Sequence, residues 1–110
     1  MVAPARPYHQ AVTGDGTALS VELALKRDSG AAAIRHQAGL FRGRVHGIQV
    51  QDNPLAWVHM SPLAASSLLL SEGVDAIPQL TCRDRNRIGL LSDLLGLQAL
   101  GVESVLLGRG

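Results

Sequence analysis

Short apolar runs alternate with helix-forming segments along most of this chain, and the alternation limits the possible folds more than any other feature. The runs that resemble strands cover residues 18–25, 45–50, 74–80 and 102–107. The segments between them that resemble amphipathic helices cover residues 31–40, 63–70 and 87–100. Because strands that alternate with helices pair in parallel through right-handed crossovers, the sequence predicts an α/β fold with order βαβαβαβ.

Residues with known helix-end preferences stand at the borders of these segments. Asp28 or Ser29 is expected to cap the first helix, and Asn86 the third. Ser61 followed by Pro62 predicts the start of the second helix, since proline at the first helical position loses no hydrogen bond. Glycines are expected to end the three helices, at Gly43, Gly73 and Gly101.

The length of the chain leaves two architectures open. A complete (β/α)8 barrel needs about 250 residues, whereas this chain has 110. Four strands therefore fit either a small open sheet or half of a TIM-type barrel. Pro78 counts against the third strand because it lacks a backbone N–H. Residues 1–18 show turn residues and no periodicity, so we expect a flexible N-terminal arm before a domain that covers residues 19–110.

Composition excludes several classes of partner. The net charge of +1 gives no electrostatic basis for binding nucleic acid or an anionic membrane, and aromatic residues make up only 3%. No apolar stretch approaches the roughly 18 residues of a membrane span. Cys82 is the single cysteine, which is typical of a reducing compartment. We expect a soluble, cytoplasmic protein that binds neither nucleic acid nor membrane.

Polar residues gather where the four predicted strands end, and the stretch QLTCRDRNR (79–87) is the densest example. Parallel α/β folds place their sites at the carboxyl ends of strands. The polar residues expected at this edge are Lys26, Arg27, Asp28, Gln51, Asp52, Asn53, Gln79, Thr81, Arg83, Asp84 and Arg109. Loops are polar in any case, so a purely structural role for these residues stays open.

Glu22 is the sharpest single candidate, because a carboxylate within an apolar strand is costly to bury. It either points outward to solvent or a lysine, or points into a barrel. In the second case its carboxyl group would tend to hold a proton and could act as a general acid.

Other reactive residue types carry less weight. Cys82 has no neighbouring histidine in the sequence, and we expect it to pack as a small apolar residue and not to act as a nucleophile. The histidines lack the spacing of metal ligands, so no metal site is predicted from His9, His36, His46 and His59.

Two stretches resemble the methylenetetrahydrofolate reductase family. Residues 77–110 read IPQLTCRDRNRIGLLSDLLGLQALGVESVLLGRG, and residues 52–73 read DNPLAWVHMSPLAASSLLLSEG. The family has a P-[HQ]-L-T-C segment at the end of its third strand, a helix that ends in A-L-G, and a fourth strand that closes with R-G-D or T-G-D. The resemblance runs from about residue 18 to the last residue, with these motifs in the family's order.

The resemblance implies a (β/α)8 barrel that binds FAD and passes a hydride from NAD(P)H to methylenetetrahydrofolate. Glu22 then matches the acid that protonates the folate. Gln79 stands where the family has a flavin-contacting His or Gln, and Gln51 stands in place of a threonine that contacts flavin. Arg109 and Gly110 match the flavin-side loop. The implied partners are the folate substrate and either a second copy of the chain or a complementing barrel half.

The chain departs from the family at several positions. Leu25 and Lys26 occupy the place of a Pro-Pro pair, and Gly108 replaces a leucine. The sequence stops at Gly110, one residue before the loop aspartate, so the chain is expected to be a truncated form that is inactive by itself. A non-catalytic half-barrel interaction module, or a degenerate fragment, is the alternative.

Overall fold

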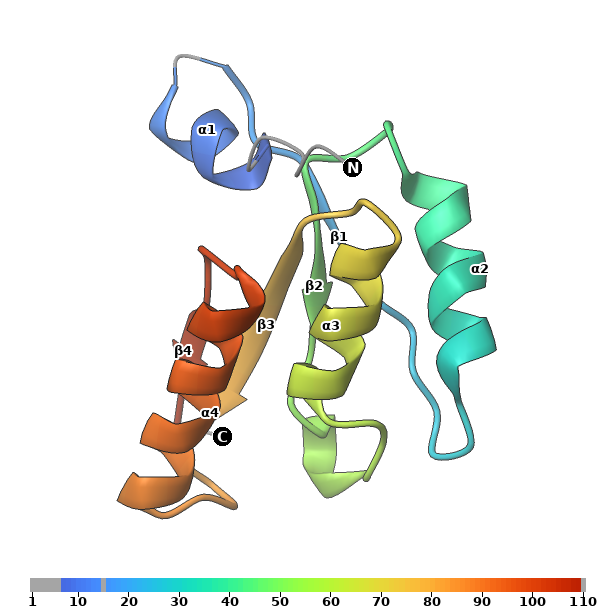
Figure 1. Ribbon diagram of the computed structural model, residues 1–110. Coiled ribbons are helices and arrows are strands. Elements are labelled where there is room, and N and C mark those ends of the chain that lie inside the picture. Colours follow the sequence, from blue (N-terminus) through green and yellow to red (C-terminus); the bar gives the residue numbers. More distant parts are fainter. Residues whose placement is uncertain (1–6, 15, 110) are drawn as a thin grey trace.

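The four strands of the protein form one parallel sheet in a computed structural model that describes residues 7–14 and 16–109 (Figure 1). The strands follow one another across the sheet in chain order, β1-β2-β3-β4. Their bounds are Ser20–Glu22 for β1, Gly47–Val50 for β2, Ala76–Thr81 for β3 and Leu106–Gly108 for β4. The predicted α/β fold with parallel strands is confirmed.

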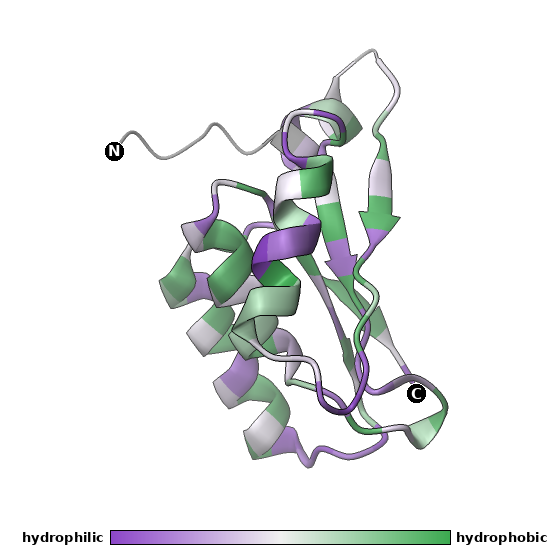
Figure 2. Ribbon diagram, turned by 90° about the vertical axis from the view of Figure 1, so that its right-hand side faces the viewer, coloured by the Kyte–Doolittle hydropathy of each residue, from purple (hydrophilic) through white to green (hydrophobic). Residues whose placement is uncertain are grey.

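Three helices connect the strands and cover one face of the sheet, while the opposite face carries no helix along most of its length (Figure 2). These helices are α2 (Ala31–Phe41), α3 (Pro62–Ser71) and α4 (Arg87–Leu100), and each lies close to its predicted range. A short 3₁₀ turn, η1 (Pro54–Ala56), lies between β2 and α3. We call the uncovered side of the sheet the open face.

The alternation of side chains along the strands defines the two faces. Ile48 and Val50 of β2 and Ala76 of β3 are fully buried in one cluster with Ile34 of α2 and Leu69 of α3. A second cluster joins β3 to α4 through Leu80 and Leu97. Since neighbouring residues of a strand point to opposite faces, the residues between these core positions point to the open face.

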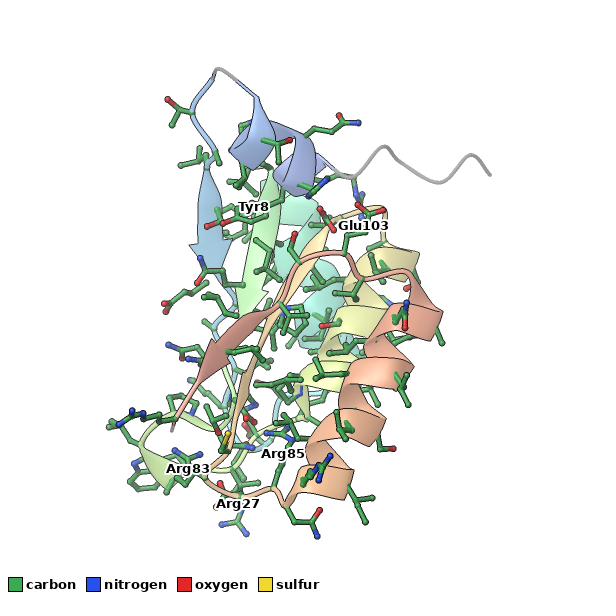
Figure 3. All side chains as sticks on the ribbon, turned by 90° about the vertical axis from the view of Figure 1, so that its left-hand side faces the viewer. Tyr8, Arg27, Arg83, Arg85 and Glu103 are labelled. Atoms are coloured by element: carbon green, nitrogen blue, oxygen red, sulfur yellow. The ribbon has the colours of Figure 1, made fainter. Side chains whose placement is uncertain are left out.

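The amino end of the open face is covered by a helix that the sequence did not predict. Helix α1 (Pro7–Thr13) forms within the segment that we expected to be an arm without regular structure. The backbone N–H of Tyr8 donates to Oδ2 of Asp75 at 3.3 Å, and Tyr8 lies against Gly47, where a Cβ would come within 3.2 Å of the Tyr8 Cβ (Figure 3). The helix is thus placed by tertiary contacts, which periodicity does not report. Residues 1–6 of the predicted arm lie outside the described residues.

The two edge strands are shorter than predicted. Strand β1 covers three residues of the expected 18–25, and β4 begins at Leu106 instead of residue 102. Each edge strand has one neighbour, so its length is set by how far that neighbour can pair with it. Pro78 does lie within β3, but the pairs between β3 and β4 begin at Gln79, one residue later. The missing N–H of Pro78 therefore does not interrupt that ladder.

Two of the three predicted N-caps are confirmed. Ser61 accepts a hydrogen bond from the Ala64 N–H at 3.2 Å, and Asn86 accepts one from the Gly89 N–H at 2.7 Å. The cap predicted for the first helix is wrong, because Gly30 occupies the N-cap of α2 without a side-chain bond. The Ser29 hydroxyl instead accepts from the Lys26 N–H, which closes the preceding turn.

Gly101 ends α4 as predicted, with a φ of 96° that favours glycine. In residues 7–14 and 16–109, no helix combines the length and apolar character that crossing a bilayer requires.

Candidate functional site

Three of the residues expected at a site lie together on the open face, at the carboxyl ends of neighbouring strands. Glu22 is the last residue of β1, Gln51 follows β2, and Gln79 belongs to β3. The Gln51 side chain donates to the Glu22 carboxylate, from Nε2 to Oε2, at 3.1 Å. We call Glu22, Gln51 and Gln79 the open-face group.

Gln79 is held in place by a residue of the loop that follows β2. The backbone N–H of Asp52 donates to the Gln79 Oε1 at 3.3 Å. This bond orients the amide, so its Nε2 is the end turned toward β4, where a Cβ on Gly108 would lie 3.8 Å away. A carboxylate and two amides thus line one edge of the open face.

Strand alternation decides the direction of Glu22. Val21 packs against the core beneath the helices, so Glu22 points to the open face, where it is exposed to solvent. Ser20, two residues earlier, shares that face and accepts a hydrogen bond from the Gln49 side chain at 2.9 Å. Of the two positions predicted for Glu22, exposure to solvent is the one observed, and the pointing into a barrel stays a prediction.

A cleft of about 740 Å³ opens beside Glu22, between the end of β1 and helix α2. Gln37 of α2 fixes its wall, because its side-chain amide accepts from the Ala24 N–H at 2.9 Å and donates to the Ala24 carbonyl at 2.7 Å. Glu22 and Gln51 line the cleft together with Lys26. Its size falls within the roughly 300–1,000 Å³ of small-molecule pockets, and it places a carboxylate, an amide and an ammonium group within reach of one ligand.

A second polar cluster occupies the same edge of the sheet but is enclosed by the chain. Asp52 is only 3% exposed, and its Oδ2 accepts from the N–H and the hydroxyl of Thr81 at 2.8 and 2.9 Å. Arg85 forms an ion pair with Asp52 and another with Asp93 of α4, the latter at 2.8 Å. We call Asp52, Thr81, Arg85 and Asp93 the buried ion-pair group.

The ionisation of this group follows from its contacts. Burial acts to raise the pKa of Asp52, but hydrogen bonds from Arg85 and Thr81, together with the charge of Arg85, outweigh it and lower that pKa below its ordinary value. The hydrogen bond to Asp52 likewise raises the pKa of Arg85. Both groups are therefore charged at neutral pH and neutralise one another.

The remaining polar residues of the stretch 79–87 also find partners within the chain. The Arg83 Nη2 donates to the backbone carbonyls of Asp52 and Asn53 at 3.2 and 2.7 Å, and its Nε pairs with Asp84. Asn86 caps α4. The structural role that the sequence left open thus applies to these residues, which fasten the loops after β2 and β3 to one another.

Three further expectations concern residues near this edge. Arg109 follows β4 and is exposed, and no hydrogen bond or ion pair joins it to the open-face group within the described part of the chain. Gly110 lies outside the described residues. Cys82 is exposed as a free thiol, so the expectation that it packs as an apolar residue is wrong, because β3 ends one residue earlier.

The loop that follows β2 has a backbone conformation that the sequence did not predict. Asn53, Leu55 and Ala56 adopt left-handed φ angles of 47°, 58° and 61°, which residues other than glycine rarely adopt. The Asn53 side chain accepts from the His59 N–H at 2.9 Å and so closes the loop. The Asn-Pro pair at its start was the available signal for a turn.

No group of three metal-ligating side chains occurs among the residues that the structure describes. No family model, no curated protein and no solved structure matches the chain.

Proposed function

We propose that the chain forms half of a (β/α)8 barrel in a flavin-dependent oxidoreductase of the methylenetetrahydrofolate reductase type. The proposed reaction reduces 5,10-methylenetetrahydrofolate to 5-methyltetrahydrofolate with NAD(P)H. One observation carries the proposal: Glu22, Gln51 and Gln79, which the family resemblance names as site residues, lie side by side at the carboxyl edge of the open face.

The topology of the sheet supports the barrel part of the proposal. A doubly wound sheet reverses its strand order and has helices on both faces. In this chain the strand order follows the sequence without reversal, and α2, α3 and α4 cover a single face. A barrel needs that arrangement, with its helices outside and its open face inside.

The open face offers suitable groups for a flavin, which supplies hydride transfer when bound. Gln51 and Gln79 present side-chain amides that can donate to and accept from the polar edge of an isoalloxazine ring. Glycine at position 108 leaves the surface beside Gln79 free of a side chain. Arg109 would approach the cofactor from the end of β4, and Gly110 is assigned to the same site by the family resemblance alone.

Glu22 has the role of the acid in this proposal. Its carboxyl group is accessible from the open face and has a fixed neighbour in Gln51, whose amide sets its orientation. Proton donation by a positioned side chain contributes roughly 10²–10⁴-fold to a rate. Glu22 would give its proton to the folate nitrogen as the methylene bridge opens.

The edges of the sheet support association with another chain. Leu106 and Leu107 of β4 are 43% and 67% exposed. Three apolar residues on the outer side of α4 are exposed as well, namely Ile88, Leu91 and Leu95. We propose that a complementing barrel half, or a second copy, covers this apolar edge. The same surface favours the second candidate function, a non-catalytic interaction module.

Flavin titration of the purified chain, by itself and with a chain that supplies the other half of a family barrel, tests the proposal. By itself the chain should be colourless, because a flavin on the open face would keep much of its surface in water. The complemented protein should bind flavin and reduce the folate substrate.

The variant Glu22→Gln then separates the two candidate functions. In the complemented protein it should lower folate reduction about 10²–10⁴-fold while NAD(P)H oxidation by the flavin continues. Stable complexes without flavin would favour the interaction module. Folate reduction unchanged by Glu22→Gln would refute the assigned role of Glu22.

A further inference from the structure

A second cleft lies next to the one that contains Glu22, and the proposed reaction uses none of its side chains. It has a volume of about 450 Å³ and lies between the loop after β1 and the loop after β2. The two clefts share Leu25 and Lys26 in their walls. The two clefts therefore adjoin at the end of the segment that follows β1.

The second cleft has an aromatic wall that is unusually accessible. Trp57 is 76% exposed, although large aromatic side chains are mostly buried in a protein of this kind. It follows the left-handed residues Leu55 and Ala56 directly. Left-handed conformations of such residues cost free energy and persist only where the surrounding structure imposes them, a situation found often at ligand-binding loops.

Several bonds impose this conformation on the loop. The N–H of Ala56 donates to the Asn53 carbonyl at 3.1 Å, and the N–H of Trp57 donates to the Pro54 carbonyl at 3.1 Å. Arg83 holds the start of the loop through the Asn53 carbonyl at 2.7 Å. The exposed indole is consequently presented by a fixed backbone, which lowers the entropy cost of binding a flat ligand.

The charged residues of the cleft indicate the ionic character of its ligand. Lys26 and Arg27 line it, and no carboxylate is among its lining residues. Arg27 lies at the same end of the molecule as Arg83 and Arg85 (Figure 3). Arg83 and Arg85, however, have carboxylate partners in the chain, whereas no ion pair is found for Lys26 or Arg27 within residues 7–14 and 16–109. A ligand with a planar ring and an anionic group fits these residues.

We propose that this cleft binds an adenosine diphosphate group, with the adenine ring stacked on Trp57 and the phosphates paired with Lys26 and Arg27. Stacking tolerates any flat base, and the two cations provide charge-assisted bonds to phosphate oxygens. The group is the adenosine end of a dinucleotide whose reactive ring lies beside Glu22, an extension that rests on the proposed function. Both NAD(P)H and FAD contain this group.

Trp57 is the single tryptophan of the chain, so its fluorescence reports on this cleft alone. We expect titration with ADP to change the tryptophan emission with a saturable curve that weakens at higher salt. Lys26→Ala and Arg27→Ala should each weaken ADP binding about tenfold or more. Arg44→Ala, which removes an exposed arginine far from this cleft, is the matched control and should leave ADP binding unchanged.

Calorimetry with Trp57→Phe and Trp57→Ala separates stacking from charge. Phenylalanine should retain most of the ADP affinity, while alanine should lower it by about fivefold to a hundredfold. Competition by NADPH or by FAD then identifies which dinucleotide supplies the group, and either result supports the site. Failure of both to compete would refute the extension to a dinucleotide.

Two results would overturn the inference, and both are independent of folate chemistry. One is the absence of any ADP response in fluorescence and calorimetry at millimolar ligand. The other is a response to a poly-γ-glutamate peptide or to inorganic phosphate that equals the response to ADP. Since the assay contains neither flavin nor folate, a loss of the proposed reductase activity with intact ADP binding would refute the proposed function alone.

Discussion

The open-face group and the buried ion-pair group lie at the same edge of the sheet and even alternate along the chain, yet their surroundings are opposite. Gln51 and Asp52 are consecutive residues, but the first is half-buried at the open face and the second is fully buried. Asp52 receives bonds from Thr81 and Arg85. Glu22 accepts one hydrogen bond within the described residues, from Gln51, although a carboxylate can accept about four.

This difference shows how a structural polar cluster is distinguished from a candidate site. The buried group uses its hydrogen-bonding capacity inside the chain and fastens three segments together, namely the loop after β2, the end of β3 and helix α4. The open-face group retains capacity for a ligand. Residue type and sequence position did not separate the two groups, because both consist of polar residues that follow strands.

The largest expected effect on stability comes from breaking the buried ion pair. Arg85→Ala leaves Asp52 as a buried carboxylate without its cation and should lower the free energy of unfolding by about 3–5 kcal/mol. Urea denaturation measures this change. Arg87→Ala, an exposed arginine two residues away, is the matched control and should change the value by less than about 0.5 kcal/mol. Equal effects of the two variants would show that the ion pair contributes little.

The same pair should make stability depend on acid. Because the pKa of Asp52 is lowered in the folded state, its contribution is fully present above the unfolded-state pKa and is lost as pH falls through the folded-state pKa. The difference in unfolding free energy between the wild type and Arg85→Ala should therefore shrink as the pH is lowered below about 4. A difference that stayed constant across the acid range would contradict the assigned ionisation.

A smaller effect is expected at the helix caps. Asn86→Ala removes the acceptor for the Gly89 N–H and should cost about 1 kcal/mol, and Ser61→Ala should cost the same or less, because its bond to Ala64 is longer. Ser92→Ala, in the exposed middle of α4, should be neutral or slightly stabilising. Thermal and urea unfolding of the three variants measure these changes. If Asn86→Ala changed the free energy of unfolding no more than Ser92→Ala does, the cap at Asn86 would contribute nothing to stability.

The smallest expected effect on stability belongs to the open-face group. Glu22→Gln keeps the shape of an exposed side chain and should change the free energy of unfolding by less than about 0.5 kcal/mol. If it instead destabilised the chain as much as Arg85→Ala, then Glu22 would be a structural residue, and its proposed role as an acid would lose its basis. Circular dichroism during urea unfolding gives the comparison.

The sequence predicted the elements that depend on local chemistry. The three covering helices lie close to their expected ranges because side-chain periodicity and the caps at Ser61 and Asn86 act over a few residues. The alternation of strands with helices along the chain predicted a parallel sheet. The ranges predicted for β1 and β4 were too long. Each strand extends only as far as it pairs with its neighbour, whereas the apolar run in the sequence continues further.

The candidate site could be predicted only as a set of residues. Glu22, Gln51 and Gln79 were expected at one edge because the carboxyl ends of parallel strands meet there. Which polar residues turn outward, however, depends on partners far away in the chain, such as Arg85 and Asp52, which are 33 residues apart. The expectation that Cys82 packs inside was wrong for a related reason, as the strand ends one residue too early to bury it.

The sequence by itself determined the α/β class, the three helices α2, α3 and α4, and the residues that reach the carboxyl edge, because these follow from spacing and from preferences of neighbouring residues. The tertiary structure alone decided the docking of α1 on the amino end of the sheet through Tyr8, and the left-handed loop that exposes Trp57. It also decided the burial of Asp52. These features rest on contacts between segments that are distant in sequence, and the free energy of such contacts exists only once the chain has brought the segments together.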